Sequence, residues 1–151
     1  MRSKQTRCLI TAIVSLICGL AALNVAAEQD SLFEQRGMYQ SAVEKYSAGK
    51  TTEANRLAKR LEDYPLYPYL QYHKLRVRLN HVSGKSMNRF AAEHSELPVT
   101  PLIFNRWLKK QAAKRRWKTF LKYYPGSENT ELQCYYLRAL YATGQKTEAL
   151  D

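Results

Sequence analysis

Two neighbouring carboxyl groups, Glu62 and Asp63, are the first candidates for chemistry in this chain of 151 residues. Paired carboxyls carry out acid–base hydrolysis when one of them is held in a protected site with a raised pKa. Glu62 and Asp63 are adjacent in the sequence at the expected end of a helix, so their side chains should point apart and both should be solvated. We therefore expect no catalytic residue at this pair.

Three histidines, His73, His81 and His94, are candidate metal ligands, and only His94 has an acidic neighbour, Glu93. Metal sites need several ligands at characteristic spacings, and these histidines show none of them. No glycine-rich phosphate loop and no Ser-His-Asp order stands out either. We expect no metal-binding residue, no cofactor-binding residue and no cofactor.

The beginning of the chain is typical of a secretory signal peptide. Basic residues precede an almost uncharged apolar run over residues 8–25, and the small residues before Glu28 indicate cleavage after Ala27. The run is short for a membrane span, which needs ~20 clean apolar residues. Residues 1–27 should therefore be removed, leaving an exported soluble protein without a membrane span.

Cys134 is the only cysteine left after cleavage, because Cys8 and Cys18 leave with the signal peptide. Exported compartments oxidise thiols, and a single cysteine there is either buried or paired with a partner. Its place on the last helix puts its side chain near the expected buried stripe. We predict a disulfide whose other half lies beyond Asp151; a buried free thiol is the alternative.

The formal net charge of +11 invites a nucleic-acid hypothesis. An exported protein meets anionic cell-wall polymers and lipid head groups instead, so we expect no nucleic-acid partner. The basic residues also fall on single sides of the expected helices, as on a solvated face. Trp107 and Trp117 could stack on sugar rings, although their spacings fit a helix–helix core better.

Apolar residues recur at spacings of three and four, and no stretch alternates convincingly with a period of two. This pattern predicts an all-α fold. Start signals predict helices that begin at Ser31, Thr52, Pro68, Ser86, Thr100, Trp117 and Asn129. Gly49 and Gly84 are expected to end the first and third of them.

Two short patterns recur along the chain. The pattern YxxGxxTEA occupies residues 46–54 and 141–149, and LxxYP occupies residues 61–65 and 121–125. They match parts of a helical hairpin repeat: an aromatic residue before a glycine turn, a capped helix, and a tyrosine-proline stop. We expect a right-handed α-superhelix, a solenoid of antiparallel helical hairpins.

The octapeptide DYPLYPYL, residues 63–70, is the most distinctive stretch. Each proline fixes its own φ and disfavours the α region for the residue before it, so Tyr64 and Tyr67 should be extended. Pro68 can open the next helix. We expect Tyr64, Pro65, Tyr67 and Pro68 to have a structural role, as a rigid corner between two helices.

Extended to LEDYPLYPYL, residues 61–70, this stretch resembles a segment near the mature N-terminus of the large soluble lytic murein transglycosylases of Gram-negative bacteria. Weaker support comes from Leu97-Pro98, residues 117–124 and residues 134–136, so that the resemblance covers most of the chain from about Ser31. It implies that this region is part of an α-superhelical scaffold and that the catalytic domain lies much further along the chain.

The resemblance also implies what the whole periplasmic enzyme does. By this resemblance, the whole enzyme cleaves the bond between N-acetylmuramic acid and N-acetylglucosamine in peptidoglycan and leaves 1,6-anhydro ends. The catalytic residue of that family is a glutamate followed by serine in a lysozyme-like domain. No glutamate in this chain is followed by serine. Residues 28–151 are therefore expected to be a non-catalytic N-terminal scaffold segment that meets peptidoglycan, and other cell-wall proteins, through the full-length enzyme.

An alternative from another class is a stand-alone periplasmic helical-repeat adaptor that binds a protein in its concave face. The two hypotheses differ in whether the coding sequence continues beyond Asp151 into a catalytic domain. The chain stops at Asp151, shortly after its second glycine turn, so we expect the scaffold domain to be incomplete at its C-terminus.

Overall fold

The computed structural model describes residues 31–145, and this part of the chain is helical, without a strand. The helices are a first helix over residues 31–47, α2 (Thr51–Lys59), α3 (Tyr67–Val77), a short 3₁₀ helix η1 (Leu79–His81), α4 (Gly84–Glu93), α5 (Val99–Ala113), α6 (Trp117–Tyr123) and α7 (Thr130–Ala142). The predicted signal peptide, residues 1–27, lies outside the described residues. The residues just before Ser31, which would decide whether the first helix starts there, also lie outside them.

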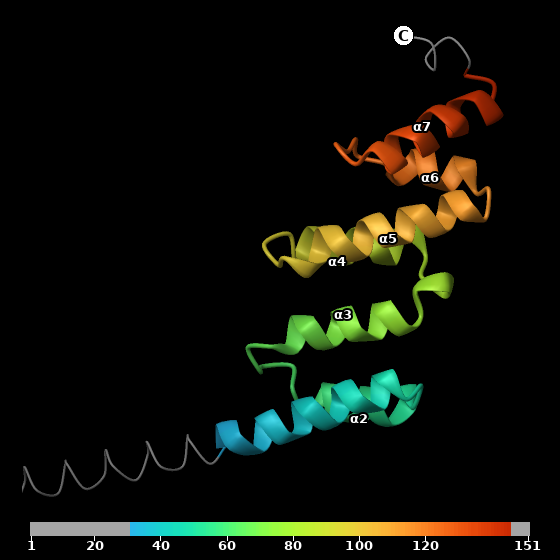
Figure 1. Ribbon diagram of the computed structural model, residues 1–151. Coiled ribbons are helices and arrows are strands. Elements are labelled where there is room, and N and C mark those ends of the chain that lie inside the picture. Colours follow the sequence, from blue (N-terminus) through green and yellow to red (C-terminus); the bar gives the residue numbers. More distant parts are fainter. Residues whose placement is uncertain (1–30, 146–151) are drawn as a thin grey trace, which may run out of the picture.

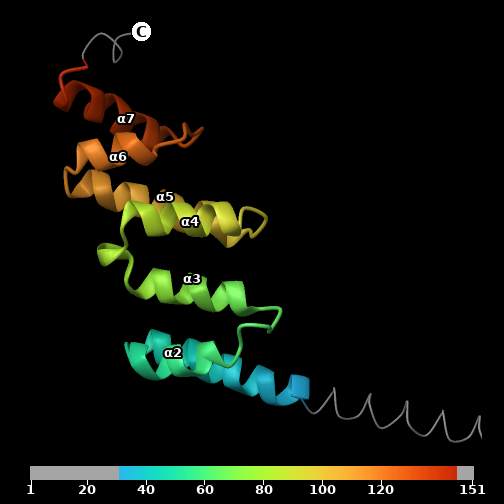
Figure 2. The ribbon, with the colours of Figure 1, turned by 180° about the vertical axis from the view of Figure 1, so that it is seen from behind.

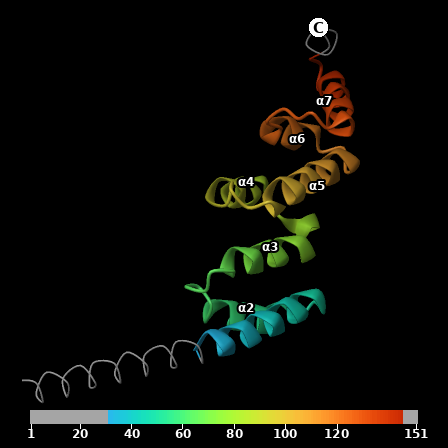
Figure 3. The same ribbon diagram turned by 60° about the vertical axis from the view of Figure 1, so that its left-hand side comes forward.

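The helices run back and forth and stack along one direction. Figure 1 shows the first helix at one end of the stack and α7 at the other, and the turned views in Figures 2 and 3 show the same elongated arrangement. The helices pack on immediate and next-but-one neighbours in sequence, for example α6 on α7 and α3 on α5, as expected for a solenoid. The predicted all-α stack of helical hairpins is confirmed.

The apolar side chains form two separate clusters. The N-terminal cluster consists of Ala42, Tyr46, Ala54, Ala58, Leu61, Tyr64 and Leu70. The C-terminal cluster consists of Leu79, Met87, Phe90, Ile103, Trp107, Leu108, Ala112, Phe120, Leu132 and Ala139. Because α3 supplies Leu70 to the first cluster and leads into Leu79 of the second, it lies where the two clusters meet.

The two glycine turns of the sequence repeat have the same geometry. At the first, Gly49 has a φ of 75°, its N–H donates to Tyr46 O at 3.0 Å, and the next N–H donates to Lys45 O at 2.9 Å. At the second, Gly144 has a φ of 86°, and the two bonds run to the carbonyls of Tyr141 and Leu140. Both are Schellman caps with glycine in the left-handed position, which confirms this half of the repeat.

A third turn of this kind joins α5 to α6 without a glycine. Arg115 has a φ of 53°, its N–H donates to Ala112 O at 2.8 Å, and Arg116 N–H donates to Gln111 O at 2.9 Å. The predicted helix start at Trp117 requires a turn before it, but the sequence does not show that this turn matches the glycine turns, because Arg115 stands in the place of glycine. An arginine in this conformation carries steric strain that glycine lacks.

Arg115→Gly is therefore expected to stabilise the fold. The left-handed conformation costs an L-residue about 1–2 kcal/mol, and part of this gain is lost because glycine makes the unfolded chain more flexible, leaving about 1 kcal/mol. Urea denaturation of the whole chain measures it. Gly49→Ala, at the matching position of the first turn, should have the opposite sign, and a destabilising Arg115→Gly would contradict the strain.

The proline corner contains a hydrogen-bonded turn. Tyr67 N–H donates to Tyr64 O at 2.8 Å, and Leu66, with a φ of −93° and a ψ of 9°, has the dihedrals of the third residue of a type I turn whose second residue is Pro65. Pro68 lies in the first turn of α3. The prediction that Tyr67 is extended is wrong, because Tyr67 is already the first residue of α3.

Two predicted helix starts are wrong because the residues lie inside their helices. Thr52 lies inside α2, whose N-cap residue is Lys50, because the chain enters α2 directly from the Gly49 turn. Thr100 lies inside α5, which begins at Val99 because Pro98 already has helical dihedrals. The Thr100 hydroxyl donates to His94 O instead of capping the helix.

The junction between α3 and α4 also differs from the prediction. The third helix ends at Val77 and η1 replaces its last turn, so Gly84 does not end it but begins α4. Ser83, not Ser86, caps α4: its side chain accepts a hydrogen bond from Ser86 N–H at 3.1 Å. Glycine is needed at residue 84 because the Tyr123 ring occupies the place of a side chain there.

Candidate functional site

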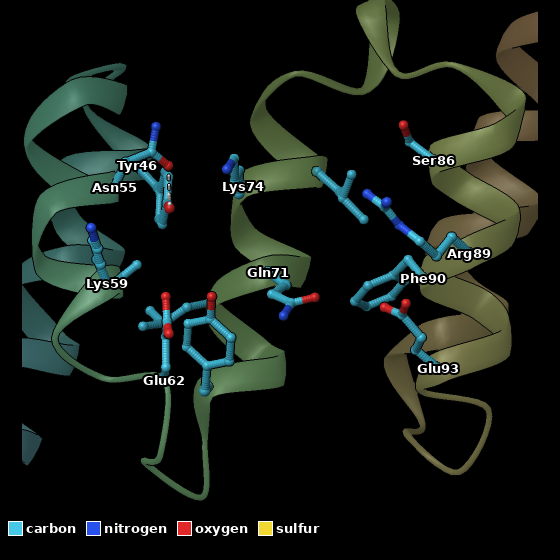
Figure 4. Close-up of a pocket in the computed structure, with 14 residues that line it drawn as sticks. Tyr46, Asn55, Lys59, Glu62, Gln71, Lys74, Ser86, Arg89, Phe90 and Glu93 are labelled. Carbon is cyan, nitrogen blue, oxygen red and sulfur yellow. Dashed lines mark hydrogen bonds between the residues drawn. The ribbon is translucent and has the colours of Figure 1, made fainter.

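An open groove of about 560 Å³ runs across α3, with α3 as its floor and α2 and α4 as its walls. Apolar groups from both clusters line its base, among them Leu70, Leu75 and Phe90. The polar residues in Figure 4 come from these three helices, from the turn after α2 and, in the case of Tyr46, from the first helix. Because it combines a concave shape with polar groups from several helices, we take this groove as the candidate site.

Five charged side chains of the groove and the amide of Gln71 form two rows. One row, the cationic row, contains Lys59, Lys74 and Arg89. The other, the acidic row, contains Glu62, Gln71 and Glu93. Figure 4 shows the three cations nearer one end of the groove and the three acidic-row residues nearer the other.

The rows follow from helix geometry. On α3 and α4 the two residues are three or four positions apart, about one helical turn along the axis. On the other wall, Lys59 ends α2 and Glu62 lies in the turn that follows it. The direction reverses on α3, where Gln71 precedes Lys74, because α3 runs antiparallel to its neighbours. The pattern is invisible in any one helix and emerges only when all three are placed together.

None of the five charged groups in the two rows forms an ion pair with another residue of the range 31–145; the ion pairs found there are Lys45–Glu53, Arg60–Glu34 and Lys109–Glu131. In the two pairs that join a lysine to a glutamate, the hydrogen bond from the lysine holds the pKa of the glutamate carboxyl below its usual range. The groove charges are thus available to a ligand.

Two hydrogen bonds hold uncharged groups of the groove. Tyr46 OH donates to Asn55 Oδ1 at 2.9 Å, which fixes the amide of Asn55 at the wall. Gln71 Oε1 lies 3.2 Å from His94 Nε2 and ties the floor helix to the end of α4. Both amide NH₂ groups remain as donors.

The predicted corner borders this groove. Tyr67 lines it at the start of α3, whereas Tyr64 is buried in the N-terminal cluster and its ring lies 5.8 Å from that of Tyr39. Pro65 is exposed and Pro68 is half-buried. The corner thus positions one wall of the groove relative to its floor.

The histidines and tryptophans lie elsewhere. Among the described residues, no group of three or more His, Cys, Asp or Glu side chains is placed to hold a metal ion. Burial lowers the pKa of His73, with a smaller contribution from the charge of Arg76. Trp107 is buried in the C-terminal cluster, and half-buried Trp117 lies under Arg138, which supports the core interpretation of both rings.

Cys134 is exposed, so its predicted position near the buried stripe is wrong. The alternative prediction, a buried free thiol, is wrong for the same reason. The reason is the helical register: Cys134 shares a face of α7 with Leu137 and Tyr141, at i, i+3 and i+7, and these are exposed at 47% and 63%. The buried face of α7 carries Leu132, Ala139 and Leu140 instead. The disulfide to a residue beyond Asp151 stays a prediction.

Labelling with a maleimide tests that prediction. In the isolated chain the Cys134 thiol should react without denaturant because it is exposed, and Cys134→Ser should remove the labelled peptide from a tryptic digest. Protein purified from the periplasm of the native host should stay unlabelled at Cys134 when denatured but not reduced. Stoichiometric labelling there would rule out the disulfide.

No known family model matches the chain. It is 31% identical over 137 residues to the soluble lytic murein transglycosylase of Escherichia coli K12, a match that covers 89% of this chain and 21% of that protein. The corresponding protein of Salmonella typhimurium is 30% identical over 138 residues, covering 91% and 21%.

Solved structures agree with these relatives. The lytic transglycosylase Slt of Pseudomonas aeruginosa, an inactive mutant, superposes with a TM-score of 0.63 at 37% identity and covers 74% of this chain and 18% of its own. The 70-kDa soluble lytic transglycosylase of Escherichia coli gives a TM-score of 0.70 at 29% identity, covering 78% and 19%.

The chain is homologous to one part of the soluble lytic murein transglycosylases. The resemblance drawn from residues 61–70 is thereby confirmed. The chain spans about a fifth, 21%, of the length of these lytic transglycosylases. Within residues 31–145, no helix is both long and apolar enough to cross a membrane.

Proposed function

We propose that this chain forms the N-terminal part of the superhelical scaffold of a periplasmic soluble lytic murein transglycosylase and takes no part in bond cleavage itself. The observation that carries the proposal is the structural match: three quarters of the chain, 74–78%, superposes on under a fifth, 18–19%, of two lytic transglycosylases. The whole enzyme would act on peptidoglycan, and the scaffold would hold or steer the strand.

The carboxylates of the groove support a non-catalytic role. Glu62 and Glu93 are both exposed to solvent. A general acid for glycoside cleavage works in a site protected from water, and neither of these exposed carboxylates lies in one. The predicted signal peptide, residues 1–27, supports export to the periplasm.

Incubation with murein sacculi tests the non-catalytic role. The whole chain should release no anhydromuropeptides above buffer, while the Escherichia coli enzyme under the same conditions should release them. Clear release by this chain would overturn the proposal.

A chimera tests the scaffold role. Residues 31–145 replace the matched segment of the 70-kDa Escherichia coli enzyme, and the chimera should fold and keep most of its muropeptide release. A matched control replaces the same segment with an unrelated helical hairpin stack of equal length and should be inactive. A well-folded but inactive chimera of the first kind would contradict the proposal.

A further inference from the structure

We propose that the groove over α3 binds a short peptide that carries both free carboxylates and a free amine. The two charge rows carry this inference. A ligand that fits both must present anionic groups to Lys59, Lys74 and Arg89 and a cationic group, about one helical turn away, to Glu62 and Glu93.

The cationic row calls for an anionic ligand group. Three like charges gathered in one concave site repel each other, and no carboxylate within residues 31–145 pairs with any of them. Walls of low dielectric strengthen the field of such a cluster. Binding of a carboxylate relieves this repulsion, and Arg89 can hold it with two parallel hydrogen bonds.

The acidic row excludes ligands of a single charge sign. A nucleic acid or another uniformly anionic polymer lying along the groove would meet Glu62 and Glu93, and a polycation would meet the cationic row. Placing like charges against each other disfavours both classes. A zwitterionic ligand of the right spacing satisfies both rows at once.

The remaining lining fits a peptide better than a small amino acid. The base offers apolar contact through half-buried Tyr67 and Leu75, and the NH₂ groups of Asn55 and Gln71 are available to peptide carbonyls. The volume of about 560 Å³ is in the range of sites for ligands of several residues. The groove is open along its length, so a ligand attached to a larger polymer can enter it.

The source of the peptide rests on the proposed function. In an enzyme that acts on murein, peptides attached to the polymer are one source of such a ligand. Free peptides of the same chemistry are the other source, and the experiment separates the two.

Isothermal titration calorimetry on the whole chain tests the groove. The probe is the tetrapeptide Ala-Glu-Lys-Ala with free termini, compared with a form amidated at both carboxyls and a form acetylated at both amines. The free peptide should bind saturably, and each blocked form about tenfold more weakly, since blocking removes the charge-assisted hydrogen bonds to one of the two rows. Equal binding of all three forms, or no saturable binding of the free form, would overturn the proposal.

Matched variants place the binding in the groove. Arg89→Gln should weaken binding of the free peptide about tenfold, and Glu93→Gln should weaken it without changing the affinity for the amine-acetylated form. The control Arg106→Gln removes an exposed cation from α5, outside the groove, and should leave the affinity unchanged. Equal effects of Arg89→Gln and Arg106→Gln would mean nonspecific charge attraction and would overturn the site.

Arg89, Glu93 and Arg106 are all exposed, so the three variants should fold like the parent chain. Circular dichroism checks this. Co-sedimentation with murein sacculi distinguishes the sources: retention lost in Arg89→Gln indicates polymer-linked peptide, and retention that does not depend on Arg89 limits the site to free peptide. Failure of peptide binding leaves the activity of the chimera untouched, so the two proposals fail separately.

Discussion

Trp107→Ala is expected to lower the free energy of unfolding by about 3–5 kcal/mol, the range for removing a fully buried large aromatic side chain. Trp107 is 1% exposed at the centre of the C-terminal cluster. Its ring packs edge-on against Tyr123, with centroids 5.7 Å apart. Its Nε1–H donates to Val82 O at 3.0 Å, so the substitution also leaves a carbonyl without its partner.

Trp117→Ala is the matched control. Trp117 is only half-buried and lies in α6 under Arg138, at 5.8 Å from the ring centroid. Its removal should cost less than half as much, because less apolar area is returned to water. Urea denaturation followed by circular dichroism measures both variants, and equal losses would contradict a core centred on Trp107.

Gly84→Ala should destabilise the protein by about 1–3 kcal/mol, the range for overpacking. A Cβ atom at residue 84 would lie 2.0 Å from Tyr123 Cε2 and 2.5 Å from Cζ, well inside contact distance. The Tyr123 ring cannot move away freely because it packs against Trp107. The substitution therefore forces α4 away from the end of α6.

Gly37→Ala isolates this effect from helix propensity. Gly37 also lies in a helix, and a Cβ there meets nothing within 4 Å, so the alanine should stabilise by roughly 0.5–1 kcal/mol. In the Tyr123→Ala background, Gly84→Ala should lose its penalty, as a double-mutant cycle would show. A penalty that persists there would mean that Tyr123 is not its cause.

The sequence predicted elements well where local signals agreed. The last helix was expected from Asn129, and Asn129 does cap α7 by accepting a hydrogen bond from Leu132 N–H at 3.1 Å. In α5, too, apolar residues that recur at spacings of three and four are buried, among them Ile103, Trp107 and Leu108. In α7 the cap and the apolar period indicate the same register.

Predictions failed where a distant residue decided the local structure. Glycine at residue 84 indicated a helix end, but the Tyr123 ring, far along the chain, is what requires it. The cap at Ser83 was missed because Gly84 was taken as the end of the preceding helix. Cys134 was assigned to the buried side from its place on the last helix between Leu132 and Tyr136, although helical register turns it outward.

The groove could not be predicted at all from single helices. Lys74 was assigned to a solvated basic face, and Glu62 to a solvated pair with Asp63. Both assignments describe the exposure correctly, yet they omit that α2 and α4 bring matching charges to either side of α3. Such a site depends on the stacking distance between helices, which no local pattern encodes.

The division of the apolar side chains into two clusters has a consequence for cooperativity. Where two small cores share only one helix, the halves can open one at a time, and unfolding need not be a single step. Amide hydrogen exchange should then show α5 and α7, which lie in the larger cluster, exchanging more slowly than α2. The groove, at the boundary between these two units, would widen or close whenever one of them shifts, so a ligand bound across α3 would couple their opening and slow exchange on both sides at once.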